Sequence, residues 1–380
     1  MPLKIRRRAT ARAIARAALA LAFTCFFTAC GNADKDTLAP ASPPSGTAAA
    51  TADNNASEAL APPAQDIAHL VKSPLSGAYI TPEAARQRPV AVVINNHHKA
   101  LPQSGISQAD ILYEVLAEGD ITRIVAIFQG FDAAKIGPVR SARAYFLDFA
   151  IDNHAIFTHH GGSPQAYADI PRLKLDNLDG MQLDGSVFWR DPVRVKQPGM
   201  YEHSSYTNAE NLEAEIAQKG YVNELGDSDK PMFQFYDEPS SPPDSQPALE
   251  LTVPYSNSQH ARFVYNDVEK TYTRYQGPKG DEPHIDAETN ETLTCDNIIV
   301  QEANMYVIAG DNAGRREVNL VGDGKGYLFT NGVYAPITWK KTSRSAQTQW
   351  FDAKGEPLTL NQGKTWICVF IDLNQLQIIK

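Results

Sequence analysis

The alternation of hydrophobic and polar residues divides the chain into stretches of different character. Residues 17–27 form a short continuous apolar run, whereas residues 30–66 are rich in Ala, Pro, Ser and Thr and show no apolar period. Such a composition predicts a disordered tether. Apolar runs with strand or helix spacing then fill residues 67–236 and 247–380, on either side of the polar, Pro-rich stretch 237–246. The pattern predicts two domains joined by a linker, each large enough to close its own core.

The N-terminal domain is predicted to be a mixed α/β sheet. Because at least two of its helices should begin just after strands, we expect ligands to gather at the strand ends. The expected elements are strand 90–94, a hairpin of 111–116 and 121–128, helix 142–151, strand 155–158, helix 164–170 opened by Ser163 and Pro164, and a helix that a Thr207/Glu210 capping box begins and that ends near Gly220.

The C-terminal domain shows short β-rich runs separated by tight turns such as Asp323-Gly324 and Asn331-Gly332. This pattern predicts a mostly antiparallel β sandwich or barrel. No repeat of constant period is visible, which argues against a propeller or a solenoid. The fold class is therefore α+β, with a mixed α/β sheet domain followed by the β-rich domain.

The N-terminus resembles a bacterial lipoprotein signal. Six basic residues without an acidic one precede the apolar run, which ends at Thr28-Ala29-Cys30, and Phe27 stands where Leu is usual. The resemblance implies a signal peptide over residues 1–29, cleavage before Cys30 and a lipid on that cysteine. The alternative is an uncleaved anchor. Either reading predicts an extracytoplasmic protein held at a bacterial membrane, by a lipid anchor in the first case.

The charge balance limits the partners. The precursor has 35 basic and 44 acidic residues, and removal of residues 1–29 with their six basic side chains leaves a formal charge of −15. This acidic body argues against nucleic-acid binding. Because the body as a whole would repel an anionic envelope polymer, any contact with such a polymer must be confined to a local site.

Two cysteines remain after the signal and the lipid site. Cys295 and Cys368 could pair in an oxidising compartment, or they could stay unpaired as small buried hydrophobic side chains. The chain has no CxxC spacing, and the adjacent His97 and His98 would point to opposite sides of an extended segment. We therefore predict neither a metal nor a cofactor.

The strongest candidate for chemistry is the run GPVRSAR at residues 137–143. It places Arg140 and Arg143 at the expected start of a helix, with Ser141 as the N-cap, so free backbone N–H groups and two guanidinium groups would share one anion. The alternative is a structural network in which the arginines pair with acidic side chains, namely Asp110, Glu114, Asp148 or Asp152.

A second candidate is the loop HHGGS at residues 159–163. Glycines let backbone amides approach a ligand, and a neighbouring histidine could act as general acid or base. A strand-to-helix turn also needs glycines for geometry alone, and Ser163 fits a helix cap better than a nucleophile. Arg190-Asp191 and the run 203–207 flank an irregular Pro/Gly-rich stretch of the kind that often forms a functional loop.

Several runs together resemble the YerB-like bacterial lipoproteins, a two-domain family whose domains are named as of unknown function. They are KIGPVRSARAYFLDFA, HHGGSPQAY, GKGYLFTNG, YAPITWKK and LNQGKTWI. The likeness runs from about residue 88 to residue 366, and loop 193–205 departs from the family pattern. The resemblance implies an envelope location and a fold boundary, but it implies no reaction.

Two hypotheses about function follow. The first is a cell-envelope lipoprotein that binds an anionic or glycan envelope ligand, or a partner protein. The alternative is a metal-dependent phosphotransferase or hydrolase acting on a phosphorylated envelope substrate, with the arginines on phosphate and Asp110 on a divalent cation. The candidate ligand-binding residues are Arg140, Ser141, Arg143, His159, His160, Gly161, Gly162, Ser163 and Asp110.

Overall fold

The structure, a computed structural model, describes residues 69–380. The strands of its N-terminal half are β1 (Val71–Lys72), β2 (Tyr79–Ile80), β3 (Val90–Asn95), β4 (Ile111–Leu116), β5 (Thr122–Phe128), β6 (Ile156–His159), β7 (Asn177–Asp179), β8 (Trp189–Arg190), β9 (Ser205–Tyr206) and β10 (Gln234–Phe235). The helices are α1 (Pro82–Arg86), α2 (Phe146–Asp152), α3 (Pro164–Arg172), α4 (Gly180–Leu183) and α5 (Ala209–Lys219). Single 3-10 turns are η1 (His98–Ala100), η2 (Ile106–Gln108), η3 (Glu118–Asp120), η4 (Tyr201–His203) and, near the C-terminus, η5 (Leu373–Gln375).

The C-terminal half is built almost entirely of strands. They are β11 (Gln246–Pro247), β12 (Glu250–Ser256), β13 (Gln259–Asn266), β14 (Thr271–Gln276), β15 (Glu282–Pro283), β16 (Thr294–Cys295), β17 (Asn297–Glu302), β18 (Met305–Val307), β19 (Arg316–Val318), β20 (Gly322–Thr330), β21 (Val333–Lys341), β22 (Gln349–Phe351), β23 (Thr359–Leu360), β24 (Thr365–Phe370) and β25 (Gln377–Ile379).

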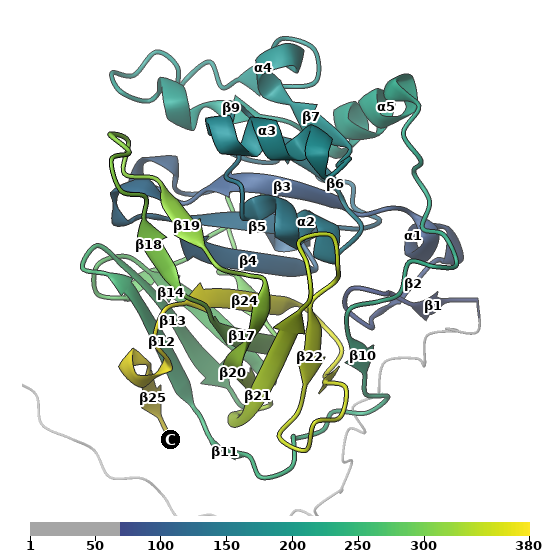
Figure 1. Cartoon of the computed structure of the whole chain (residues 1–380), viewed down its shortest axis with the longest axis vertical. Helices are drawn as coiled ribbons and strands as arrows, with labels where there is room; N and C mark the ends of the chain where they lie inside the picture. Colours follow the sequence, from purple (N-terminus) through teal and green to yellow (C-terminus); the bar gives the residue numbers. More distant parts are fainter. Residues whose placement is uncertain (1–68) are drawn as a thin grey trace, which may run out of the picture. The chain divides into compact units, whose positions relative to one another are not determined.

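Most strands belong to two sheets (Figure 1). An 11-stranded sheet has the order β11-β21-β20-β17-β24-β4-β5-β3-β6-β7, with β22 beside β21. A 6-stranded sheet has the order β15-β14-β13-β12-β25, with β16 beside β14. Aromatic side chains join the two sheets, because Phe263 and Tyr255 pack edge-on against Trp366 and Phe370. The predicted α+β class is confirmed.

The central strands follow from local pattern. All residues of β3, β4 and β5 are buried, as continuous apolar runs predict for strands covered on both faces. Strands β4 and β5 pair antiparallel, which confirms the predicted hairpin. Strand β6 returns parallel to β3 after α2, and α2 packs against β3, β5 and β6. The sheet therefore brings the ends of β3 and β6 together.

Helix α2 begins later than predicted. We expected a helix from residue 142 with Ser141 as its N-cap, but α2 starts at Phe146, and its N-cap Tyr145 makes no side-chain capping hydrogen bond. The reason is that the preceding backbone is used elsewhere: the amide of Arg140 donates to Val93 O at 2.8 Å and that of Ala142 to Gly161 O at 2.9 Å. The predicted helix start and the Ser141 N-cap are therefore wrong, and Arg140 and Arg143 do not lie at a helix N-terminus.

The other two helix boundaries rest on local signals. Ser163 caps α3 by accepting a hydrogen bond from the amide of Ala166 at 3.2 Å, as predicted. Helix α5 ends at Gly220 in the left-handed conformation, also as predicted. Its N-cap is Asn208 and not Thr207, because the Thr207 hydroxyl donates to Val187 O at 3.0 Å.

The two halves share one sheet, which corrects the expectation of two closed cores. Strand β24 lies between β17 and β4 and pairs parallel with both. The described residues, 69–380, accordingly belong to one compact unit. The position of the linker at residues 237–246 stays a prediction.

Some sequence predictions lie outside the described residues. These are the signal peptide 1–29, the lipid site Cys30 and the tether 30–66. Among residues 69–380, no helix has the length and apolar character needed to cross a bilayer.

The disulfide alternative is not realised. Cys295 and Cys368 are both free and buried. Burial raises the pKa of both thiols above the ordinary cysteine value, so these side chains behave as small core residues and not as reactive thiols.

Candidate functional site

The segment 137–143 runs in extended conformation across the ends of β3 and β6. Val139 forms a bridge with Ile94 at the end of β3. On its other side, Arg140 O accepts a hydrogen bond from the His160 amide at 3.0 Å. The structure thus places the two candidate loops, 137–143 and 159–163, side by side at the strand ends.

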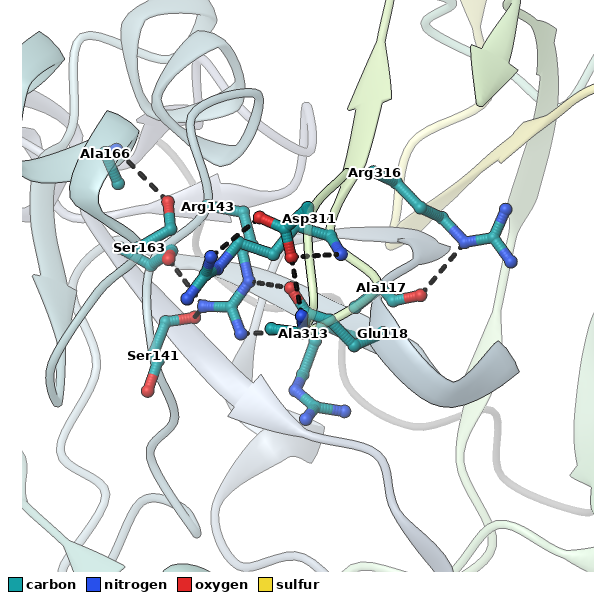
Figure 2. A network of polar contacts seen from close by, with 12 residues as sticks. Ala117, Glu118, Ser141, Arg143, Ser163, Ala166, Asp311, Ala313 and Arg316 are labelled. Carbon is teal, nitrogen blue, oxygen red and sulfur yellow. Dashed lines mark hydrogen bonds and ion pairs between the residues drawn. The ribbon is translucent and has the colours of Figure 1, made fainter. Parts of the chain in front are cut away.

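Arg143 is a structural side chain. Figure 2 shows its guanidinium reaching Glu118 of η3, with Nη2 2.6 Å from Oε2 and Nε bonded to Oε1. Nη1 donates to the Ala142 carbonyl at 2.7 Å. Burial opposes the charge on Glu118, yet Arg143 lowers the pKa of this carboxyl below its ordinary value. All of these donors are occupied within the protein, so Arg143 is removed from the candidate ligand site.

A cleft of about 410 Å³ opens beside the other arginine. This volume lies in the range of small-molecule sites. The predicted residues that line it are Arg140, Ser141, His160, Gly161 and Gly162, and they are joined by Val139, Tyr167, Met181, Arg190, Tyr201 and Glu202. We call this the Arg140 cleft.

Arg140 has one ion-pair partner within the cleft. Its Nη2 lies 2.5 Å from Oε2 of Glu202, on η4. The arginine side chain is 22% exposed, whereas that of Glu202 is 67% exposed. Arg140 Nε is buried and has no hydrogen-bond partner among the described residues. An exposed carboxylate on a one-turn helix therefore neutralises a guanidinium that is fixed in the cleft wall.

A buried arginine adds positive charge behind the cleft. Arg123 on β5 is 7% exposed, and among residues 69–380 its guanidinium forms a hydrogen bond to Thr122 O and no ion pair. Burial, and then Arg140 and Arg143, lower the pKa of Arg123 to about 10. The guanidinium groups of Arg123, Arg140 and Arg143 thus have two carboxylates nearby, those of Glu118 and Glu202.

Arg190 and His160 form the opposite wall. Arg190 Nη2 lies 2.7 Å from His160 Nε2, and His160 Nδ1 lies 2.7 Å from Ser205 Oγ. Because arginine only donates, Nε2 accepts and the proton sits on Nδ1, which donates to Ser205. Burial and the Arg190 charge lower the pKa of His160. His160 is therefore a neutral residue that positions Arg190.

Asp179 binds three residues that line the cleft. Its Oδ1 accepts hydrogen bonds from the amides of Gly161 and Met181, both at 2.9 Å. Its Oδ2 accepts from the Tyr167 hydroxyl at 2.8 Å. The carboxylate ties the loop after β6 to the N-terminus of α4, and this fixes the position of Gly161.

Two predicted residues of the HHGGS loop do not reach the cleft. The ring of His159 is fully buried, with Nδ1 2.8 Å from Gly161 O and Nε2 3.4 Å from Asn177 Oδ1. Ser163 is used as the cap of α3. Of this loop, His160, Gly161 and Gly162 line the cleft.

Asp110 lies at the opposite end of β4, which corrects its placement in the site. The cleft lies where β3 ends. There Asn95 of β3 pairs with Arg123 of β5, and Arg123 pairs with Val115 near the end of β4. Asp110 precedes β4, and burial raises its pKa to about 6. The carboxylate that the phosphotransferase hypothesis requires beside Arg140 is therefore elsewhere, and residues 69–380 contain no cluster of side chains able to hold a metal ion.

Sequence reasoning missed Arg190, Tyr201 and Glu202 as cleft residues, and it missed Asp179 as the residue that fixes Gly161. A signal for three of them existed, since they lie in or beside the irregular stretch that was predicted to form a functional loop. Nothing in the local sequence around Asp179 indicates that its carboxylate meets the loop after β6.

Comparisons with known proteins place the chain in a family. Residues 75–222 match the N-terminal domain, and residues 251–367 the C-terminal domain, of a protein family of unknown function, DUF3048. The chain belongs to the DUF3048 family. The family resemblance predicted from the sequence is thereby confirmed. Both matched segments contribute strands to the 11-stranded sheet.

A DUF3048 relative is known by sequence and by structure. The chain is 37% identical over 320 residues to YerB of Bacillus subtilis strain 168, which is named as a lipoprotein, and the match covers 83% of this chain and 91% of that protein. The crystal structure of YerB from Bacillus subtilis matches with a TM-score of 0.71 at 35% identity, and it covers 82% of this chain and 100% of that one.

Proposed function

We propose that this DUF3048 protein is a lipid-anchored extracytoplasmic protein that binds an anionic ligand in the Arg140 cleft. The observation that carries the proposal is the pairing of Arg140 with Glu202. A fixed guanidinium with a buried, unpartnered Nε faces a single exposed carboxylate on a surface turn. An incoming anion can replace such a partner without disturbing the core.

The anchor rests on two independent observations. The N-terminal residues have the charge and apolar pattern of a lipoprotein signal that ends at Cys30, and the Bacillus subtilis relative is named as a lipoprotein. Residues 30–66 would then connect the lipidated cysteine to the folded unit. A ligand at the envelope surface would be within reach of the cleft.

Local charge supports an anionic ligand. The chain as a whole carries a formal charge of −9, yet the cleft walls hold Arg140 and Arg190, and the carboxylates that pair with them, Glu202 and Asp184, are both exposed. Arg123 lies behind them without an ion pair among the described residues. A guanidinium pair of this kind can bind a carboxylate or a phosphate through charge-assisted hydrogen bonds.

Calorimetric titration of the full-length protein in detergent with inorganic phosphate tests the anion site. Arg140→Ala should weaken phosphate binding about tenfold or more, because it removes the charged donor. Arg86→Ala removes an exposed arginine of α1 far along the chain from the cleft and serves as the matched control. Equal affinity of the Arg140→Ala variant and the parent would contradict the proposal.

Glu202→Gln gives the opposite expectation. The variant removes the internal competitor for Arg140, so phosphate should bind more tightly, by up to about fivefold for an exposed ion pair. Glu269→Gln, a substitution at an exposed carboxylate of the C-terminal half, controls for the change in net charge. A weaker affinity in Glu202→Gln would mean that Glu202 belongs to the ligand site as a binding group and not as a competitor.

A further inference from the structure

Large apolar side chains are exposed around the two arginines of the Arg140 cleft. Met181 is 65%, Tyr201 57% and Tyr167 42% exposed, and all three line the cleft. They come from three different elements, α4, η4 and α3. Exposed apolar surface that is gathered in a cleft and rimmed by polar groups marks a ligand-binding surface.

The aromatic faces have a defined arrangement. The guanidinium of Arg190 stacks on the Tyr201 ring with its central carbon 4.5 Å from the ring centroid. More than half of the Tyr201 surface remains open to solvent. A ligand whose charge meets the arginines would therefore bring its adjoining part against an aromatic face.

The polar groups between the arginines and the tyrosines suit hydroxyl ligands. Ser141 Oγ donates to His160 O at 3.0 Å, and the Tyr167 hydroxyl donates to Asp179, so both oxygens keep lone pairs that can accept hydrogen bonds. The carboxylate of Glu202 already forms the ion pair with Arg140, which shows that this position accommodates a carboxylate.

We propose that the ligand is a carbohydrate that carries a carboxylate on a substituent of its ring, and this inference rests on the proposed function. The carboxylate replaces that of Glu202 on Arg140, with Arg190 as the second cation. One face of the sugar ring, which presents C–H groups, packs on Tyr201, and ring hydroxyls donate to Ser141 and Tyr167. A free peptide carboxylate would satisfy the arginines but would bring no sugar ring with a C–H face to pack on Tyr201.

Matched sugars test the assignment on the full-length protein in detergent. N-acetylmuramic acid differs from N-acetylglucosamine by a lactyl ether that carries a carboxylate, and acetate supplies the carboxylate alone. We expect N-acetylmuramic acid to bind about tenfold more tightly than either of the other two. Equal affinity for the acid and the neutral sugar, or for the acid sugar and acetate, would overturn the inference.

Variants of Tyr201 separate the sugar face from the anion site. Tyr201→Ala should weaken N-acetylmuramic acid about tenfold and phosphate by less, because the ring also packs on the Arg190 guanidinium, whereas Tyr201→Phe keeps the aromatic face and should bind the sugar normally. Tyr306→Ala, at an exposed tyrosine of β18, is the control. An equal loss for phosphate in Tyr201→Ala would overturn the stacking role.

The two proposals can fail separately. If phosphate binds through Arg140 but an acetylated dipeptide with a free C-terminal carboxylate binds as tightly as the acid sugar, the carbohydrate assignment is wrong and the anion site stands. If phosphate binding does not depend on Arg140, the proposed function is wrong and the carbohydrate assignment falls with it.

Discussion

Arg140 and Arg143 lie three positions apart and carry the same charge, but their partners give them different roles. Glu118 is fixed in the turn between β4 and β5 and holds Arg143 with two hydrogen bonds. Glu202 lies on an exposed turn and holds Arg140 with one. A bidentate, mostly buried pair resists exchange with a ligand, whereas a single exposed pair contributes little and can be replaced.

Next to Arg140, the packing of His203 makes the stability of the folded unit depend on pH. Its ring stacks on His97 with centroids 4.8 Å apart, and its Nδ1 accepts a hydrogen bond from Asn95 Nδ2 at 2.8 Å. Burial, then His97 and Arg140, lower the pKa of His203 to about 4. Protonation would also turn the acceptor Nδ1 into a donor that faces the amide of Asn95.

The pH prediction has a definite sign. The pKa of a histidine in an unfolded chain is near 6.5. Between pH 6.5 and 4, His203 is therefore protonated in the unfolded chain but remains neutral in the folded protein. Stability from this group is complete above about pH 6.5 and is lost as the pH falls toward 4. His203→Gln should remove about 1 to 3 kcal/mol of the pH dependence of the unfolding free energy across this window. Urea unfolding of the parent and the variant at pH 6.5 and at pH 4 checks this. An equal loss of unfolding free energy in the two proteins between these pH values would refute it.

At the residue scale, local roles could be predicted and tertiary roles could not. Ser163 was predicted as a cap because its partner lies three residues ahead in the same helix. Ser141 looked the same in sequence, but its hydroxyl meets the carbonyl of His160, 19 positions away. The backbone of β3 and the turn after β6 decide its conformation, and neither is visible from the residues around Ser141.

At the element scale, the loop between β21 and β22 fastens the C-terminal half to α2. Lys341 ends β21 fully buried, with its Nζ 2.5 Å from Asp152 Oδ1 of α2 and 2.6 Å from Ala346 O. The same carboxylate accepts hydrogen bonds from the amide and hydroxyl of Thr348. Nearby, Arg344 binds both Asp148 and Asp169. The loop therefore supplies cationic partners to three carboxylates that α2 and α3 bury.

Lys341→Met tests this attachment. Removal of the ammonium leaves the buried carboxylate of Asp152 without its counter-charge, so the unfolding free energy should fall by about 3–5 kcal/mol. Lys340→Met changes the exposed neighbour on the same strand and should shift it by about 0.5 kcal/mol or less. Denaturation in urea compares the two, and a second substitution, Asp152→Asn, should recover part of the loss in Lys341→Met. Similar midpoints for Lys340→Met and Lys341→Met would contradict the buried pair.

Element identity was predictable where one period dominates. The apolar run of β3 and the hairpin of β4 and β5 are confirmed because burial on both faces leaves little choice. In β21 buried and exposed residues alternate, as expected for a strand with one covered face. The start of α2 was wrong because a competing ladder of backbone hydrogen bonds takes the residues before Phe146.

At the scale of the whole molecule, a buried ion pair ties the halves together. Glu114 of β4 and Arg274 of β14 are both fully buried and 2.8 Å apart. The Arg274 guanidinium lies 4.9 Å from the ring centroids of Phe263 and Trp366, and the Trp366 indole N–H donates to Glu114 at 3.1 Å. These partners are more than 150 positions from Glu114 in sequence, so no local pattern could have predicted one shared core.

A chain that stops at residue 246 should therefore fail to fold cooperatively. It would lose β24, leave the edge of β4 without a partner and bury Glu114 without Arg274. We expect no dispersed amide spectrum and no sigmoidal unfolding for this fragment. Co-expression with residues 247–380 should restore both, because the missing strand and arginine are then supplied in trans. A fragment 1–246 that unfolds cooperatively by itself would disprove the shared core.

The position of β24 also sets the order in which the molecule can be completed during synthesis. Domains generally fold as units as they emerge, N-terminal part first. Here the parallel neighbour of β4 is β24, which begins at Thr365 and is therefore made long after β4. Until residues 365–368 are available, β4, whose residues are all buried in the folded protein, has an open edge, which is a template for pairing with another chain. The sheet can therefore close around β4 only after residues 365–368 have been made.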